Sequence, residues 1–158
     1  KKILIVKYIS NCSGHEGVAG GQYSDLNFEN KKISLSKIKD MQVKKTGRLF
    51  SFCCIAPLIV VNKNNLIKKF MKIGEDVGLL FQIADDLIDY SGNSKIAGKK
   101  TKKDAVKGKA TLISLLGYEN TIKYSKRLKL NIFNELSKYQ KRSNDLKQTI
   151  EFILNRTN

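Results

Sequence analysis

Apolar residues recur every three or four positions along almost the whole chain, which is the pattern of helices that bury one face. No stretch of the sequence alternates apolar and polar residues clearly enough to predict a strand. A single proline interrupts the 158 residues, so few positions are closed to an α-helix. These features predict an all-α fold.

Breaks in the apolar pattern set the expected boundaries. Ser34 is a suitable N-cap for a long helix, and Gly117 is a possible break within a later one. The segment 91–109 contains three glycines and no apolar period, which predicts a long loop. The expected helical segments cover residues 3–9, 35–61, 65–90, 111–141 and 144–155, with a turn at NCSGHEG after the first.

The chain has the length of one domain, and 41% of its residues are hydrophobic, which is enough to form a core. The sequence contains no internal repeat and no evident domain boundary. We therefore expect a single helical domain over residues 1–158.

The apolar segments and the cysteines indicate the cellular compartment. The longest apolar run, about residues 50–61, is too short and too interrupted to span a bilayer, and KKILIVKYIS at the start lacks a signal-peptide cleavage site. The three cysteines have no CxxC spacing, and Cys53 and Cys54 lie in an apolar stretch, which favours buried free thiols over a disulfide or metal site. We expect a cytoplasmic protein without a transmembrane segment.

The net charge of +16 raises the possibility of a nucleic-acid or anionic-membrane partner. However, the lysines are scattered through nearly every segment, and the basic stretches lack the interleaved aromatic residues that stack on bases. We therefore expect no nucleic-acid binding. A basic helical protein that associates with nucleic acid or membrane stays as an outside alternative.

Asp85, Asp86 and Asp89 lie within five residues of one expected helix, among apolar neighbours. Like charges one turn apart destabilise a helix by about 0.2–0.5 kcal/mol per pair. No Lys or Arg occurs between Gly74 and Gly92, so the compensating charge must come from elsewhere. Gln82, Asp85 and Asp89 share one helix face, which suits Mg²⁺ and its preference for carboxylates, water and phosphate oxygens. The alternative is a solvated acidic face.

The charge inverts immediately downstream, where residues 95–109 contain seven lysines and one acid, Asp104. Carboxylates that hold Mg²⁺ beside lysines that neutralise phosphate are the combination required by phosphate chemistry. A lysine-rich loop without a ligand is the alternative.

At these residues the chain resembles a known family, the trans-isoprenyl diphosphate synthases, which include farnesyl and geranylgeranyl diphosphate synthases. FQIADDLIDYSG resembles the family's second aspartate-rich motif, and GGQYSDL resembles its GGQxxDL stretch. KKTGRLF resembles its KTG motif, and GKKTKKDAVKGKAT resembles its lysine loop. The resemblance implies the C-terminal portion of an isoprenoid-synthase helical bundle, most similar to the bacterial farnesyl type.

The resemblance also implies an activity, the condensation of isopentenyl diphosphate with an allylic diphosphate by Mg²⁺-assisted ionisation. Asp85 is then expected to ligate Mg²⁺ directly, with Asp86 and Asp89 acting through metal-bound water. The residues implied to bind substrate are Gln22, Lys45, Lys99, Asp104 and Lys109. Those with an implied catalytic role are Lys45, Thr46, Gln82 and Lys99, of which Thr46 and Gln82 would steady the developing cation.

The family's first aspartate motif is not found in these residues, and the chain begins with Lys. We therefore expect an upstream half that is absent here, an inactive fragment without it, and a homodimer when complete. The alternatives are a non-catalytic subunit that regulates a full-length synthase and a pseudo-enzyme fragment. His15 and Glu16 do not form HExxH, so His15 is expected at the surface, while Gly20 and Gly21 are expected to allow close helix packing.

Overall fold

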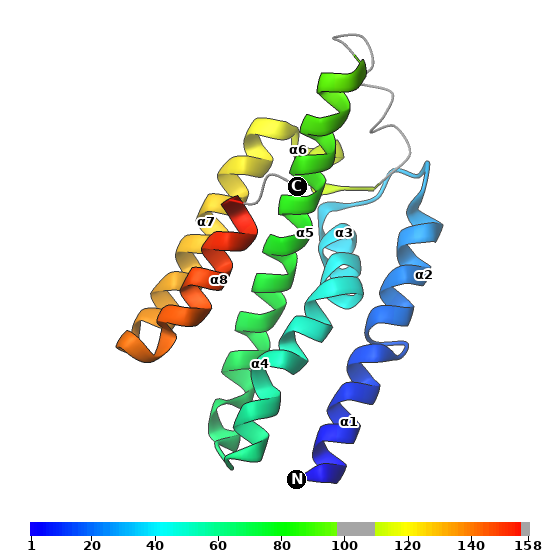
Figure 1. The fold of residues 1–158 in the computed structure, drawn as a ribbon. Coiled ribbons are helices and arrows are strands. Elements are labelled where there is room, and N and C mark those ends of the chain that lie inside the picture. The colour runs from blue at the N-terminus through cyan, green and yellow to red at the C-terminus, as the bar shows by residue number, and fades with distance from the viewer. Residues whose placement is uncertain (98–109, 156–158) are drawn as a thin grey trace. The chain divides into compact units, whose positions relative to one another are not determined.

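The computed structural model describes residues 1–97 and 110–155, and their regular structure is entirely helical (Figure 1). The all-α prediction is confirmed. The α-helices are α1 (Lys2–Ser13), α2 (Val18–Phe28), α3 (Leu35–Gln42), α4 (Arg48–Val60), α5 (Ile67–Ala97), α6 (Leu112–Leu116), α7 (Tyr118–Ser137) and α8 (Asn144–Asn155). Three short segments complete them, a π-helical turn η1 (Val43–Gly47) and 3₁₀ turns η2 (Asn64–Leu66) and η4 (Gln140–Ser143).

The chain divides into two compact units, which are described separately. Unit 1 comprises residues 1–27 and 39–79, and unit 2 comprises residues 28–38 and 80–158. The expectation of one domain over the whole chain stays a prediction.

In unit 1, α1 packs along α4. Ile55, Ile59 and Ile67 form a buried cluster, against which side chains of α1 such as Leu4 and Tyr8 pack. Full burial of an aliphatic side chain of this size stabilises a fold by about 1.5–3 kcal/mol. Packing between α1 and α4 therefore explains why both helices carry regularly spaced apolar residues.

The stretch between Ser34 and Val61 is not the single α-helix that its periodicity predicts. Ser34 accepts a hydrogen bond from the Lys37 amide at 3.4 Å, as expected of an N-cap. The helical path then changes to π geometry over Val43–Gly47 before α4 begins. The prediction of an unbroken α-helix is therefore wrong at these residues.

The first half of α5 crosses α4 at close range because glycines face it. A Cβ atom on Gly74 would lie 2.4 Å from the Cα of Ser51, a separation that real structures do not contain. Arg48 of α4 also pairs with Glu75 of α5 at 2.5 Å. The glycines and the ion pair together fix this crossing within unit 1.

The second half of α5 is longer than predicted, because the helix continues through residues 91–97. The long loop expected at 91–109 is therefore wrong in its first part, and residues 98–109 lie outside the described residues. Ser91 donates from Oγ to the Leu87 carbonyl at 2.7 Å, and the Tyr90 ring stacks on Tyr118 with centroids 5.1 Å apart. These contacts stabilise a segment whose own sequence favours a loop.

Unit 2 contains the helical hairpin of α7 and α8, which run side by side in Figure 1. The predicted break at Gly117 is confirmed, since this residue separates α6 from α7 with a φ of 77° that favours glycine. The predicted bounds of α8 are also confirmed, and its inward residues Ile150 and Ile153 are buried. Lys129 of α7 pairs with Glu151 of α8 at 2.6 Å across the hairpin.

The cysteines differ from one another in exposure. Cys12 is buried and Cys54 is half-buried, whereas Cys53 is exposed, so the prediction of a buried thiol is wrong for Cys53. Helical geometry turns adjacent residues about 100° apart, and this rotation takes Cys53 off the packed face. All three cysteines are free, and burial raises the pKa of the Cys54 thiol to about 11.

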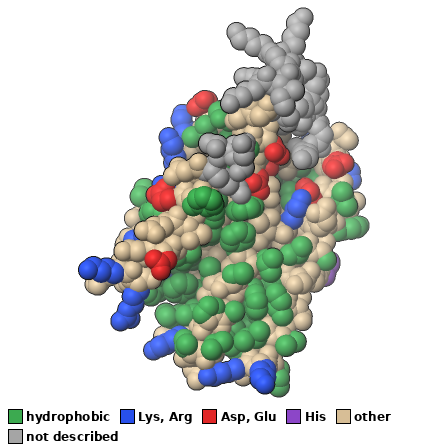
Figure 2. Space-filling model, viewed as in Figure 1, with side chains coloured by type: hydrophobic (Ala, Val, Ile, Leu, Met, Phe, Trp, Pro, Cys, Tyr) green, Lys and Arg blue, Asp and Glu red, His purple; other side chains and the backbone are tan. Residues whose placement is uncertain are grey.

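The visible surface of unit 1 carries hydrophobic side chains, which gather over α1, α4 and the start of α5 (Figure 2). Large exposed hydrophobic residues of this unit include Ile3 and Val6 on α1 and Tyr23 and Leu26 on α2. Within the described part of the chain, no helix has both the length and the apolar character needed to cross a bilayer.

Candidate functional site

The aspartate cluster lies on the second half of α5, in unit 2. Asp85 and Asp86 are half-buried and Asp89 is exposed. Asp85 and Asp89 are four residues apart, so their side chains lie on one face about 5–6 Å apart at Cβ. Gln82 donates from Nε2 to Oδ1 of Asp86 at 3.1 Å, and this hydrogen bond orients the carboxylate.

Two of the five acids between Gly74 and Gly92 are neutralised from outside that segment. Glu75 pairs with Arg48 at 2.5 Å, and Asp76 pairs with Lys72 at 2.5 Å. Both pairs lie in unit 1. The other three acids of this segment, Asp85, Asp86 and Asp89, belong to unit 2.

The chemistry of these aspartates fits a cation that is shared with a ligand. Within residues 1–97 and 110–155, no group of three or more His, Cys, Asp or Glu side chains is arranged to hold a metal ion. Mg²⁺ is commonly bound by only one or two carboxylates, with water and substrate phosphates completing its octahedron. Asp85 and Asp89 provide oxygen donors of that kind on a rigid helix.

A second group of predicted residues lies in unit 1, on the π-helical turn. Lys45 extends toward α2, where its Nζ lies 2.5 Å from Oδ2 of Asp25. Both side chains are about one-third exposed, at 32% and 31%. The ammonium group is therefore held in place while it stays accessible to an anion. Thr46 is half-buried beside it.

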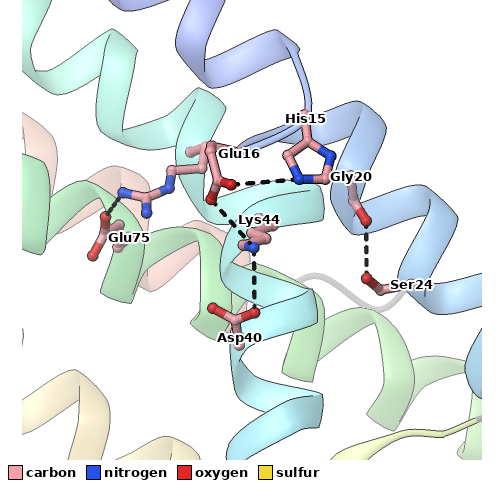
Figure 3. Close-up of polar contacts among 8 residues, drawn as sticks. His15, Glu16, Gly20, Ser24, Asp40, Lys44 and Glu75 are labelled. Atoms are coloured by element: carbon pink, nitrogen blue, oxygen red, sulfur yellow. Dashed lines mark hydrogen bonds and ion pairs between the residues drawn. The ribbon is translucent and has the colours of Figure 1, made fainter.

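Lys44, next to Lys45, takes part in a separate network (Figure 3). Its Nζ lies 3.3 Å from Glu16 and 3.6 Å from Asp40, and Glu16 also lies 3.5 Å from the ring of His15. The His15 side chain is 90% exposed, which confirms the prediction of a surface histidine. Lys44 thus joins the α1–α2 turn to the end of α3.

Sequence reasoning missed a pocket of about 550 Å³ in unit 2, at the α5 residues that follow Asp89 in the chain. Tyr90 and Ser91 line it from α5, and Tyr118 and Glu119 line it from α7. The Tyr118 hydroxyl lies 3.4 Å from Ser91 Oγ, in addition to the ring stacking. Little in the sequence predicts this pocket, because the break at Gly117 indicates only that a helix ends and another begins beside it.

Comparison with known proteins assigns these features to a family. The profile of the Polyprenyl synthetase family matches residues 3–153. The chain belongs to the polyprenyl synthetase family. The resemblance drawn from the sequence motifs is thereby confirmed.

Relatives in the polyprenyl synthetase family include the farnesyl diphosphate synthase of Micrococcus luteus, which is 31% identical over 156 residues. That alignment covers 98% of this chain and 54% of the relative. The farnesyl diphosphate synthase of Bacillus subtilis is 32% identical and is matched over 81% of this chain and 46% of its own length. The chain thus spans about half the length of the curated relatives it matches.

Solved structures of the same family share the fold. The geranyltransferase of Helicobacter pylori, in a complex with magnesium and isoprenyl diphosphate, superimposes with a TM-score of 0.77 at 29% identity. The match covers 97% of this chain and 50% of that structure. A farnesyl-diphosphate synthase described as putative, from Marinomonas, gives a TM-score of 0.79 at 28% identity, with coverage of 97% and 52%.

The family motifs fall into separate groups in the structure. Lys45 and Thr46 belong to unit 1, and Gln82 with the three aspartates belongs to unit 2. Gln22 is exposed on α2, while its neighbour in the same motif, Asp25, contacts Lys45. The predicted residues of the lysine loop, Lys99, Asp104 and Lys109, lie outside the described residues.

Proposed function

We propose that this chain is the C-terminal portion of a prenyltransferase that condenses isopentenyl diphosphate with an allylic diphosphate. The observation that carries the proposal is the pair of motif groups, the aspartates on one face of α5 and the Lys45–Thr46 turn held against α2. Family membership and relatives named as farnesyl diphosphate synthases support the same activity. The 158 residues alone are proposed to be inactive.

The reaction breaks the carbon–oxygen bond of the allylic diphosphate, and the bonding electron pair leaves with the diphosphate. The double bond of isopentenyl diphosphate then attacks the allylic cation, and loss of a proton restores a double bond in the longer chain. The main electrostatic demand is to stabilise negative charge as it develops on the leaving group. Residues that supply positive charge or hold a cation are therefore those most needed.

The residues of these two motif groups have proposed parts in meeting that demand. Asp85 would hold Mg²⁺ directly, with Asp86 and Asp89 beside it, and bound Mg²⁺ would supply Lewis-acid stabilisation of the diphosphate. Gln82 orients Asp86 through its 3.1 Å hydrogen bond. Lys45 would exchange its contact with Asp25 for one with the diphosphate, and Thr46 would lie near the reacting carbons. The homodimer and the cytoplasmic location stay predictions.

The test is prenyl transfer by the gene product that contains these residues, supplied with dimethylallyl diphosphate, isopentenyl diphosphate and Mg²⁺. We expect a prenyl diphosphate product from the wild type and a loss of at least about 10²-fold in Asp85→Ala, the magnitude typical for removing one electrostatic stabiliser. Asp145→Ala is the matched control, since Asp145 lies in the first turn of α8. It should keep wild-type activity.

Further assays on the same wild-type and variant proteins distinguish the other candidate functions. If the wild type gives no product, the proposed catalysis is overturned, and stimulation of an added full-length synthase would then identify a regulatory subunit. Binding to nucleic acid or anionic vesicles that weakens steeply with salt and ignores Asp85→Ala would identify the basic binding protein instead. Mg²⁺-dependent binding of diphosphate that Asp85→Ala abolishes supports the enzyme.

A further inference from the structure

The π-helical turn Val43–Gly47 changes which residues face the core of unit 1. Buried positions follow one another in steps of four along α4, at Gly47, Ser51, Ile55 and Ile59. The step from Gln42, the last residue of α3, to Gly47 is five. A π-helical turn has i→i+5 hydrogen bonds in place of i→i+4, which accounts for the extra residue.

This extra residue decides the exposure of Thr46. In an uninterrupted α-helix the inward position after Gln42 would be Thr46, four residues on. With the π turn, Gly47 takes the inward position, and Thr46 and Lys45 stay half-buried. The two residues assigned to substrate therefore owe their accessibility to an uncommon backbone geometry.

Two helix backbones hold that geometry from different elements of unit 1. A Cβ atom on Gly21 of α2 would lie 2.2 Å from the Lys45 amide nitrogen and 2.5 Å from its Cα. A Cβ atom on Gly78 of α5 would lie 2.5 Å from the Cα of Gly47. Each glycine thus brings its helix into direct contact with the backbone of the turn.

The α2 contact also reaches the Lys45 side chain. Asp25 lies one helical turn after Gly21, on the same face of α2, and its carboxylate meets the Lys45 ammonium at 2.5 Å. One face of α2 therefore fixes both the backbone and the charged end of the same residue.

We propose that Gly21 and Gly78 are positioning residues, which keep the 43–47 turn in π geometry and so place Lys45 and Thr46 for the allylic substrate. This inference rests on the proposed function, because it deepens the role of the same site. The atoms that an added methyl group would meet belong to the backbone and cannot rotate away. An alanine must therefore displace either the helix or the turn.

The first test does not require activity. Hydrogen exchange is measured by mass spectrometry on the gene product carrying Gly21→Ala, Gly78→Ala or Gly74→Ala. Gly74→Ala is the matched control, because its methyl group would meet Ser51 of α4, away from the turn, at a similar 2.4 Å. We expect Gly21→Ala and Gly78→Ala to speed exchange over residues 43–48 by about tenfold or more, and Gly74→Ala to leave these amides near the wild-type rate.

The second test measures steady-state kinetics at a temperature where every variant is folded. We expect Gly21→Ala to lower kcat/KM for the allylic diphosphate by roughly 10–10²-fold, because a displacement of about 1 Å at a reacting group has effects of this size. The KM for isopentenyl diphosphate should not change. If Gly21→Ala does not fold, Gly78→Ala carries the same expectation from the other helix.

Each result has one meaning. Unchanged exchange over 43–48 in the folded glycine variants overturns the positioning contact, whatever the activity. Faster exchange with an unchanged kcat/KM for the allylic diphosphate shows that the turn does not place Lys45 and Thr46 for the substrate, and overturns that part of the proposal. If Gly74→Ala speeds exchange over residues 43–48 as much as Gly21→Ala does, the cause is general destabilisation of the unit, and the proposal is also overturned. A wild type that forms no prenyl product overturns the proposed function instead, and the exchange pattern still decides the contact.

Discussion

The ion pair of Lys45 orients its ammonium group and leaves it accessible to an anion. Its ammonium is paired with Asp25, yet both side chains stay about one-third exposed, at 32% and 31%. Exposed ion pairs contribute only about 0–1 kcal/mol to stability, so the contact is easily exchanged. The pair therefore fixes the direction of the lysine more than it stabilises the fold.

The cysteines provide a test at the same scale. Burial raises the pKa of the Cys54 thiol to about 11, with a smaller contribution from the neighbouring Cys53. Because the thiolate is the nucleophile, Cys54 should react at pH 8 about 10²-fold more slowly than an ordinary thiol with a pKa of about 8.5. Its alkylation rate should continue to rise beyond pH 9, where an ordinary thiol levels off.

Iodoacetamide labelling of Cys53→Ala and Cys54→Ala distinguishes the two thiols. Cys54→Ala, which keeps the exposed Cys53, should label rapidly, and Cys53→Ala should label slowly. The sign for stability follows from the same shift. The folded-state pKa of Cys54 lies above the unfolded one, so its contribution to stability is fully present below about pH 8.5 and is lost as the pH rises toward 11. Equal labelling rates at pH 8 would contradict the assignment.

Single residues also show where sequence reasoning was sufficient. The shared face of Gln82, Asp85 and Asp89 follows from helical periodicity alone, and the described helix α5 contains all three. The exposure of Cys53 could not be foreseen, because the stretch around it is apolar on every side. Which apolar positions face the core depends on the helices that pack against α4, and the local sequence does not encode those partners.

At the scale of elements, Tyr90 near the end of α5 makes an aromatic contact with α7. The Tyr90 and Tyr118 rings stack at 5.1 Å between centroids, and the Tyr118 hydroxyl lies 3.4 Å from Ser91 Oγ. Stacked aromatic pairs contribute about 0.5–1.5 kcal/mol beyond the area that they bury. This contact joins α5 to α7 within unit 2.

We therefore expect Tyr118→Ala to destabilise unit 2 by about 1–2 kcal/mol and to unwind the last turns of α5, since both the stacking and the hydroxyl contact are lost. Tyr118→Phe keeps the ring and should retain most of the stability. Urea unfolding gives the free-energy change, and hydrogen exchange over residues 87–97 shows whether the helix end loosens. An unchanged exchange rate in Tyr118→Ala would show that the stacking does not hold the helix.

The elements differ in how far their sequences determine them. The bounds of α8 were predicted correctly, because polar residues frame a regular apolar stripe. The break at Gly117 was found because glycine marks it. In contrast, the π turn is contacted by the distant residues Gly21 and Gly78, and the end of α5 by the distant residue Tyr118. Such contacts cannot be predicted from helix propensity, which depends only on the local sequence.

On the scale of the molecule, the exposed hydrophobic surface of unit 1 has a measurable consequence. On α1, Ile3 and Val6 are 86% and 60% exposed, and on α2 Tyr23 and Leu26 are 70% and 60% exposed. Each pair is spaced three residues apart and so occupies one helix face. Exposed apolar helix faces of this kind promote association in water.

We expect the 158-residue chain to self-associate at micromolar concentrations, and the double variant Val6→Lys, Leu26→Lys to shift it toward the monomer. Analytical ultracentrifugation measures the change. Phe152→Lys is the control, because it removes an exposed hydrophobic residue from α8 in unit 2 instead. The expectation fails if the wild-type chain is monomeric at these concentrations or if the control has the same effect as the double variant.

The stacked position of Tyr118 also offers an optical signal. The chain contains six tyrosines and no tryptophan, so Tyr118→Trp would give it a single indole beside the pocket that Tyr90 and Ser91 line. Tryptophan emission shifts with the polarity around the ring, and selective excitation would isolate it from the tyrosines. Occupation of this pocket could then be followed in real time by fluorescence, without a labelled ligand.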